Sequence, residues 1–198
     1  MTTATDELEL LISGIGGQGI QLVGKTLALA ATQSGKHAML AADYGGEMRG
    51  GPSNTSVVIG SGPLQALPVL PRFGAAIVMH DKFCGAVPER LAAGALLLVN
   101  SSIVDTGAIG ENNALVALPV TELARSLGAP QSAGLIMLGA FCELTAVVGH
   151  DALAAAMCAL LPPYRAQHAA GNVAALKAGA AQVASLPVGN ERHEAGTR

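Results

Sequence analysis

A glycine-rich turn between a short apolar run and a long apolar-periodic segment constrains this chain more than any other feature. The run covers residues 8–12, the turn reads Ser13-Gly14-Ile15-Gly16-Gly17-Gln18-Gly19, and the periodic segment covers residues 20–31. This order predicts a strand, a tight turn and a helix. Gly14, Gly16 and Gly19 stand at the three positions of a G-x-G-x-x-G pattern.

The start of the predicted helix is suited to a negatively charged group. The first N–H groups of a helix have no intrahelical acceptor and carry partial positive charge, which favours phosphate or carboxylate. A turn that only packs a helix against its strand produces the same pattern, so this alternative stays open.

A second glycine-rich stretch follows another apolar run, residues 37–42, and the acid Asp43. It reads Tyr44-Gly45-Gly46-Glu47-Met48-Arg49-Gly50-Gly51, in which Glu47 and Arg49 are the only charged residues. An arginine on such a loop can hold a carboxylate or a phosphate through its fork of donors. The alternative is a surface loop whose charges are merely solvated. A β-branched run over residues 54–59 comes next, so two strands follow each other without a helix between them.

The rest of the chain alternates between buried strands and helices. Strands are expected over residues 75–80, 95–100 and 115–118, and helices from residue 119 and over residues 132–148, 152–161 and 167–184. This alternation predicts an α/β fold, a Rossmann-like three-layer sandwich with a mostly parallel sheet and helices on both faces. With 198 residues and 51% hydrophobic content, we expect a single domain over residues 1–186 and a polar, disordered tail over residues 187–198.

Composition and charge exclude several classes of partner. A net charge of −3, 3% aromatic residues and no tryptophan argue against nucleic-acid binding. The three cysteines, Cys84, Cys142 and Cys158, are too far apart for a zinc or iron–sulfur site, and their odd number suits a reducing cytosol. The N-terminus has no basic segment typical of a signal peptide, and the longest apolar run contains Glu143. We therefore expect a cytoplasmic protein that does not enter a membrane.

Two alternative functions remain open on the residues alone. In a stand-alone NAD- or FAD-binding enzyme, Asp43 would bind the ribose hydroxyls. Such an enzyme needs an acid, a base or a nucleophile, and the candidates, which show no recognisable spacing, are His80, Asp81, Glu143 and His150. The other alternative is a structural interaction domain without a site.

Taken together with the C-terminal half, the two glycine-rich stretches resemble the gamma subunit, or gamma domain, of 2-oxoacid:ferredoxin oxidoreductases. These enzymes act on pyruvate, 2-oxoglutarate, 2-oxoisovalerate (ketoisovalerate) or indolepyruvate. The resemblance continues in Pro119-Val120-Thr121-Glu122-Leu123-Ala124, in Leu138-Gly139-Ala140, and in Asn172, Ala175, Leu176 and Gly179. One departure is Gln131-Ser132-Ala133-Gly134, where members often have an asparagine just before the Leu-Gly-Ala helix.

The resemblance implies a division of labour between subunits. In this family the holoenzyme decarboxylates a 2-oxoacid on thiamine diphosphate, passes electrons through iron–sulfur clusters to ferredoxin, and releases an acyl-CoA. Thiamine-diphosphate-binding catalytic subunits and a ferredoxin-like subunit or ferredoxin carry these groups. The gamma chain, inactive alone, is expected to have no catalytic residue and no metal ligand. A homodimer of the isolated chain is left open.

The gamma part of some members is associated with coenzyme A. The resemblance therefore implies that the two glycine-rich stretches shape the interface with the catalytic subunit and contact an anionic ligand such as coenzyme A. The residues to which this cofactor-binding role is assigned are Gly14, Gly16, Gly17, Gln18, Gly19, Tyr44, Glu47, Arg49 and Gly50.

Overall fold

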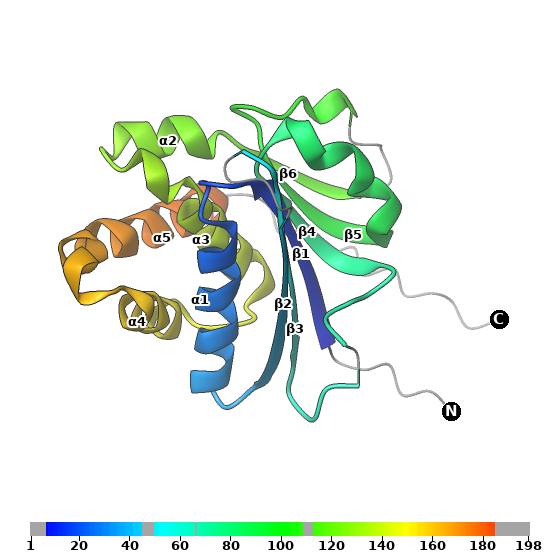
Figure 1. Cartoon of the computed structure of the whole chain (residues 1–198), viewed down its shortest axis with the longest axis horizontal. Coiled ribbons are helices and arrows are strands. Elements are labelled where there is room, and N and C mark those ends of the chain that lie inside the picture. Colours follow the sequence, from blue (N-terminus) through cyan, green and yellow to red (C-terminus); the bar gives the residue numbers. More distant parts are fainter. Residues whose placement is uncertain (1–6, 45–49, 66, 109–112, 185–198) are drawn as a thin grey trace.

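A six-stranded sheet forms the centre of the molecule (Figure 1). The computed structural model describes residues 7–44, 50–65, 67–108 and 113–184. The strand order is β2-β3-β1-β4-β5-β6, with β1 at Glu7–Ile15, β2 at His37–Tyr44, β3 at Pro52–Gly60, β4 at Phe73–Val78, β5 at Leu91–Asn100 and β6 at Ala114–Leu118. Only β3 runs against the other described strands, because it pairs antiparallel with both β1 and β2. The pairs β1–β4, β4–β5 and β5–β6 are parallel, so the prediction of a mostly parallel sheet is confirmed.

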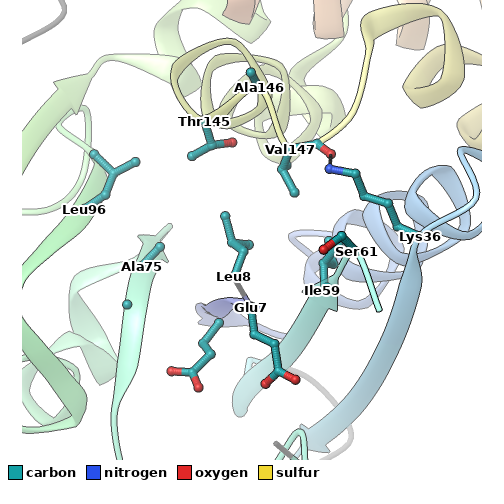
Figure 2. A pocket seen from close by; sticks show the side chains of 13 residues that line it. Glu7, Leu8, Lys36, Ile59, Ser61, Ala75, Leu96, Thr145, Ala146 and Val147 are labelled. Atoms are coloured by element: carbon teal, nitrogen blue, oxygen red, sulfur yellow. Dashed lines mark hydrogen bonds between the residues drawn. The ribbon is translucent and has the colours of Figure 1, made fainter. Parts of the chain in front are cut away.

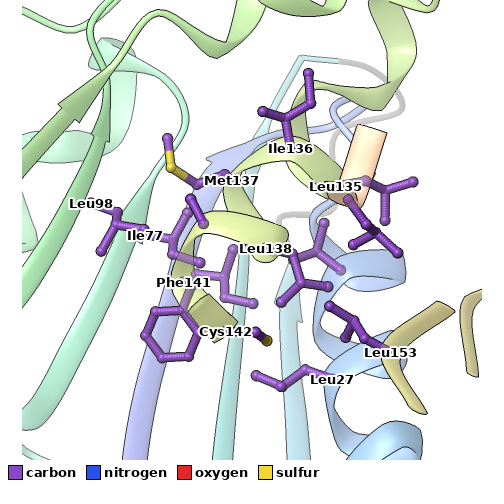
Figure 3. Packing of buried hydrophobic residues seen from close by; sticks show 14 of the residues in the cluster. Leu27, Ile77, Leu98, Leu135, Ile136, Met137, Leu138, Phe141, Cys142 and Leu153 are labelled. Atoms are coloured by element: carbon purple, nitrogen blue, oxygen red, sulfur yellow. The ribbon is translucent and has the colours of Figure 1, made fainter. Parts of the chain in front are cut away.

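The α-helices cover one face of this sheet. They are α1 at Ile20–Gln33, α2 at Val120–Ser126, α3 at Ala133–Thr145, α4 at His150–Leu160 and α5 at Ala169–Val183. All five contribute to one hydrophobic core with the strand residues that face them, among them Ile77 and Leu98 (Figure 3). Helix α3 is apolar on all sides because it lies between the sheet and the other helices, and its residues from Gly134 to Cys142 are all buried.

The opposite face has a smaller core and a different cover. The 3₁₀ helices η1, Asp81–Ala86, and η2, Pro88–Arg90, lie beside it, and the residues that pack there include Leu11, Phe73 and Leu97. Helices therefore lie on both faces, as predicted, but the α-helices gather on one face and the 3₁₀ helices η1 and η2 lie on the other. Because both faces are covered, β4 and β5 are nearly continuous apolar runs rather than alternating ones.

Helices α3 and α5 approach each other unusually closely, and two glycines permit it. A Cβ atom on Gly139 would overlap the carbonyl oxygen of Leu176, and a Cβ atom on Gly179 would overlap the carbonyl oxygen of Ile136. At one end of this contact the Ser132 hydroxyl donates to Asn172 Oδ1 at 3.2 Å. The fixed separation of α3 and α5 determines where the residues at the start of α5 lie.

Element boundaries differ from the predictions in two helices. The helix expected over residues 132–148 ends at Thr145, because Ala146 adopts a left-handed conformation with φ 50°. The helix expected over residues 167–184 begins as the 3₁₀ helix η5, Pro163–His168, before α5 starts. The predicted tail over residues 187–198 lies outside the described residues. None of the helices described has both the length and the apolar character needed to cross a lipid bilayer.

Candidate functional site

The two glycine-rich stretches meet at the carboxyl end of β1. The Gly16 N–H donates to the Gly51 carbonyl oxygen at 3.0 Å, and Ile15 pairs with Pro52 in the β1–β3 ladder. Gly50 is also close, since a Cβ atom on Gly16 would lie 3.5 Å from its nitrogen. Tyr44 closes β2 opposite Ser53, whereas the predicted site residues Glu47 and Arg49 lie outside the described residues.

Glycine is required at positions 17 and 19 because of the backbone conformation there, and not because a side chain would lack space. Their φ angles are 102° and 73°, which a residue with a Cβ atom adopts only with strain. A Cβ atom at either position would meet nothing within 4 Å. The outer surface of the turn is therefore open. Gly14 differs, because a Cβ atom there would lie 2.6 Å from Gln18 Oε1 and 2.7 Å from Ile20 Cδ1.

Both polar atoms of the Gln18 side chain form hydrogen bonds within the protein. Its Oε1 accepts from the Ile15 N–H at 3.0 Å, and its Nε2 donates to the Met79 carbonyl oxygen at 3.2 Å. These bonds connect the turn after β1 to the residue that follows β4. Gln18 is thus a positioning residue, and its amide sets the shape of the turn.

Asn100 extends this network, and the sequence-based list of site residues missed it. This side chain is fully buried at the end of β5, and its Nδ2 donates to the Met79 carbonyl oxygen at 3.2 Å and to Thr121 Oγ1 at 2.9 Å. Its Oδ1 has no hydrogen-bond partner among the described residues. The rule that carboxyl ends of parallel strands carry functional residues would have singled out this asparagine, because it ends a clearly predicted strand.

The residues after β4 hold the second glycine-rich stretch. Lys82 Nζ donates to the Gly50 carbonyl oxygen at 3.3 Å. His80 Nδ1 lies 3.2 Å from the Lys82 nitrogen and 2.7 Å from Asp81 Oδ1. Since a protonated Nδ1 donates and an unprotonated one accepts, the protonation state of His80 decides which contact is a hydrogen bond.

The other two candidates for acid–base chemistry lie apart from the turn. Glu143 Oε2 and His150 Nε2 are 2.6 Å apart and join α3 to the start of α4. Neither residue lines the cavity at the glycine turn. Their contact with each other gives both side chains a structural role. Among the described residues, no group of three or more metal-ligating side chains comes together.

A cavity of about 390 Å³ opens at the end of the sheet where β1 and β4 begin and β3 ends (Figure 2). It is bordered by Glu7, Glu9 and Lys36, and Lys36 Nζ donates to the Val147 carbonyl oxygen at 2.7 Å. Burial, with a contribution from the Glu7 charge, raises the pKa of the Glu9 carboxyl. No residue of the predicted site lines this cavity.

A second cavity, of about 470 Å³, includes the glycine turn and is called here the interhelical pocket. Gly17, Gln18 and Gly19 form one side of it, where α1 begins. Polar residues from three other elements complete its lining, namely Gln131, Arg165, His168 and Asn172. The motifs in the sequence indicate the turn alone, so Arg165 and His168 are additions that depend on the three-dimensional fold.

The position of Asp43 argues against a dinucleotide site of the ordinary kind. Because β3 lies between β1 and β2, Asp43 is about 10 Å from β1, twice the usual strand spacing. It borders a different cavity, together with Val69 and Arg90. An acid at this distance does not reach a ribose held at the turn after β1, as it would in a dinucleotide-binding fold.

Comparison with known proteins places these features in a family. The family model described as pyruvate ferredoxin/flavodoxin oxidoreductase matches residues 9–182. The chain is 34% identical over 143 residues to the ketoisovalerate oxidoreductase subunit VorA of Methanothermobacter marburgensis, covering 70% of this chain and 28% of VorA. It is 30% identical over 157 residues to the 2-oxoglutarate synthase subunit KorC of Methanocaldococcus jannaschii, covering 78% of this chain and 83% of KorC.

A solved structure agrees with these relatives. The gamma subunit of a keto/oxoacid ferredoxin oxidoreductase from Geobacter sulfurreducens superposes with a TM-score of 0.73 and 28% sequence identity, covering 88% of this chain and 95% of that one. The chain therefore spans most of some relatives but only about a quarter of VorA, which is a longer protein. The matched region contains both glycine-rich stretches, the Gln18–Met79–Asn100 network and the α3–α5 contact, and the chain belongs to the pyruvate ferredoxin/flavodoxin oxidoreductase family.

Proposed function

We propose that this chain is the gamma component of a multi-subunit enzyme that oxidatively decarboxylates a 2-oxoacid to an acyl-CoA. The observation that carries the proposal is the family match over residues 9–182, which includes the joined glycine-rich stretches. Thiamine-diphosphate-binding subunits and a ferredoxin-like electron carrier are the proposed partners. The three free cysteines, Cys84, Cys142 and Cys158, suit a cytoplasmic location for this complex.

The proposed role of the chain is assembly and ligand contact, and the chemistry belongs to the partners. The groups at the glycine turn are backbone N–H donors, a committed glutamine amide and a buried asparagine. Such groups bind and orient, but none of them is placed as a nucleophile or a general base. Supporting residues after β4 and β5 keep the turn in one conformation, so the surface it presents to a partner or ligand is preorganised.

We also propose that coenzyme A touches this chain at the carboxyl end of β1. The first turn of α1 supports this, because its N-cap is Gly19, which has no side chain to cap the helix. The N–H groups there remain available to the phosphate oxygens of a ligand. Positive φ angles at Gly17 and Gly19 keep the turn free of side chains that would block such an approach.

Anaerobic affinity purification of the tagged chain from its native extract tests the assignment. We expect larger subunits to co-purify, with bound thiamine diphosphate and iron in the complex and 2-oxoacid-dependent reduction of ferredoxin. The purified chain alone should show no 2-oxoacid oxidation. Recovery of a monomer or homodimer with a tightly bound NAD or FAD would contradict the proposal, and so would turnover by the chain alone.

A further inference from the structure

The interhelical pocket contains a group of polar residues that the glycine-turn pattern does not predict. Arg165 and His168 lie three residues apart in the 3₁₀ helix η5. A 3₁₀ helix has three residues per turn, so these two side chains lie on the same side of it. Pro162 and Pro163 precede them and fix the direction in which the segment leaves α4. Both basic residues line the pocket, facing the start of α1.

Asn172 supplies an unused donor inside the same pocket. The residue is 7% exposed, and its Oδ1 accepts from the Ser132 hydroxyl at 3.2 Å. With Oδ1 used in this way, Nδ2 is left as a donor, and it has no acceptor among the described residues. This amide N–H₂ borders the pocket, where an anionic ligand can accept from it.

No acidic side chain among the described residues lines the pocket. The residues that line it include the basic Arg165 and His168. The uncapped N-terminus of α1 adds partial positive charge and unpaired N–H groups on the facing side. The guanidinium of Arg165 lies 5.7 Å from the centre of the Tyr164 ring. Apolar walls from Leu22, Leu135 and Leu161 leave room for the uncharged part of a ligand.

From these observations we propose that the interhelical pocket is a phosphate-binding site formed by the start of α1, Arg165, His168 and Asn172. A pyrophosphate or phosphomonoester accepts from several donors at once, which matches N–H groups converging from three elements. This site adds to the coenzyme A contact proposed above. The phosphate site itself does not depend on the proposed function, whereas the identification of its ligand as coenzyme A does. Its volume of about 470 Å³ is in the range of small-molecule sites.

Calorimetric titration of the full chain with inorganic pyrophosphate at low ionic strength tests the site. We expect saturable binding of pyrophosphate to the wild type. Binding should be roughly tenfold weaker in Arg165→Gln, since a charge-assisted hydrogen bond contributes about that factor. Adding His168→Gln should lower the affinity further. Arg125→Gln is the matched control, because Arg125 is also exposed but does not line the pocket. Its Kd should equal that of the wild type.

Asn172→Asp separates binding from folding. The aspartate can still accept from Ser132, but it loses the donor and places a negative charge in the pocket. Its thermal unfolding should stay close to that of the wild type while pyrophosphate binding is lost. Absence of saturable binding to the wild-type chain, or equal Kd values for Arg165→Gln and Arg125→Gln, would overturn the proposal.

Coenzyme A and dephospho-coenzyme A identify the source of the phosphate. Competition of coenzyme A with pyrophosphate supports the site as part of the acyl-CoA-forming enzyme. Pyrophosphate binding that is lost in Arg165→Gln but is not displaced by coenzyme A supports a site for a different phosphorylated ligand. In that case the site stands, and the coenzyme A part of the proposed function fails. Failure of the chain to join an oxidoreductase complex leaves these binding measurements unaffected.

Discussion

The glycines at the start of α1 and those between α3 and α5 serve opposite purposes. At the turn, Gly17 and Gly19 have positive φ angles and open space around the missing side chain. Between the helices, Gly139 and Gly179 have ordinary helical conformations but no space at all. The turn uses glycine for its backbone freedom and leaves a surface accessible, whereas the helix pair uses glycine to bring two backbones into contact. Substitutions should therefore affect ligand binding in the first region and stability in the second.

The largest effect is expected at the helix contact. In Gly179→Ala the new methyl group overlaps the Ile136 carbonyl oxygen, so α3 and α5 must move apart, at a cost of about 3 kcal/mol. Gly139→Ala should cost a similar amount. The double variant should cost less than the sum, because helices already separated accommodate the second methyl. Chemical denaturation with a common m-value measures these differences.

Gly171→Ala is the matched control for this contact. Gly171 is also in α5, but a Cβ atom there would meet nothing within 4 Å. Replacing glycine by alanine inside a helix then stabilises by about 0.5–1 kcal/mol. A gain of stability in Gly179→Ala similar to that in Gly171→Ala would show that helix propensity and not close approach determines the result.

The next largest effect is expected at Gly14, the one glycine of the turn that lacks space. A methyl group there displaces the Gln18 amide, which then loses its bonds to the Ile15 N–H and the Met79 carbonyl oxygen. We expect Gly14→Ala and Gln18→Ala each to cost about 1.5 kcal/mol in the free energy of unfolding. Because both act through the same two hydrogen bonds, their combination should cost about as much as either alone. Simple additivity would contradict this explanation.

A smaller effect is expected at Gly19, with Gly35 as its control. Both glycines flank α1, have φ near 75° and have open space, so alanine at either should cost about 1 kcal/mol through backbone strain alone. Only Gly19 lines the interhelical pocket, and only Gly19→Ala should weaken pyrophosphate binding. Titration and thermal unfolding of the two variants, side by side, separate the two properties. Equal pyrophosphate affinity in both would remove Gly19 from the site.

The difference between these regions also explains what the sequence could predict. Gly14, Gly16 and Gly19 form a local pattern, so the turn, the following helix and the fold class follow from nearby residues. Two successive strands without a helix between them indicated a departure from simple βαβ winding, but not that β3 inserts antiparallel between β1 and β2. The interhelical pocket was not indicated either, because Arg165, His168 and Asn172 are about 150 residues away from the turn and reach it only through the α3–α5 contact. Helix α3 ends at Thr145 because the next residue, Ala146, is left-handed, and no glycine or proline in the sequence marks this position.

The smallest effect is expected at Cys142, a buried residue of α3 whose thiol makes the stability of the chain depend on pH. Burial raises the pKa of its thiol to about 12 from the ordinary value of 9.0. The folded chain therefore keeps this proton at a pH where the unfolded chain loses it. Its contribution to stability is complete below pH 9.0 and is lost as the pH rises from about 9 to about 12.

Between pH 8 and pH 9, the free energy of unfolding of the wild type should fall by a few tenths of a kcal/mol more than that of Cys142→Ala. Denaturation of both proteins at the two pH values measures this, since every other titrating group is common to the pair. If Gly179→Ala, which opens the helix contact, abolishes the pH dependence attributed to Cys142, then the close approach of α3 and α5 is what keeps this thiol dry. An unchanged dependence would assign that role to the sheet, against which α3 also packs.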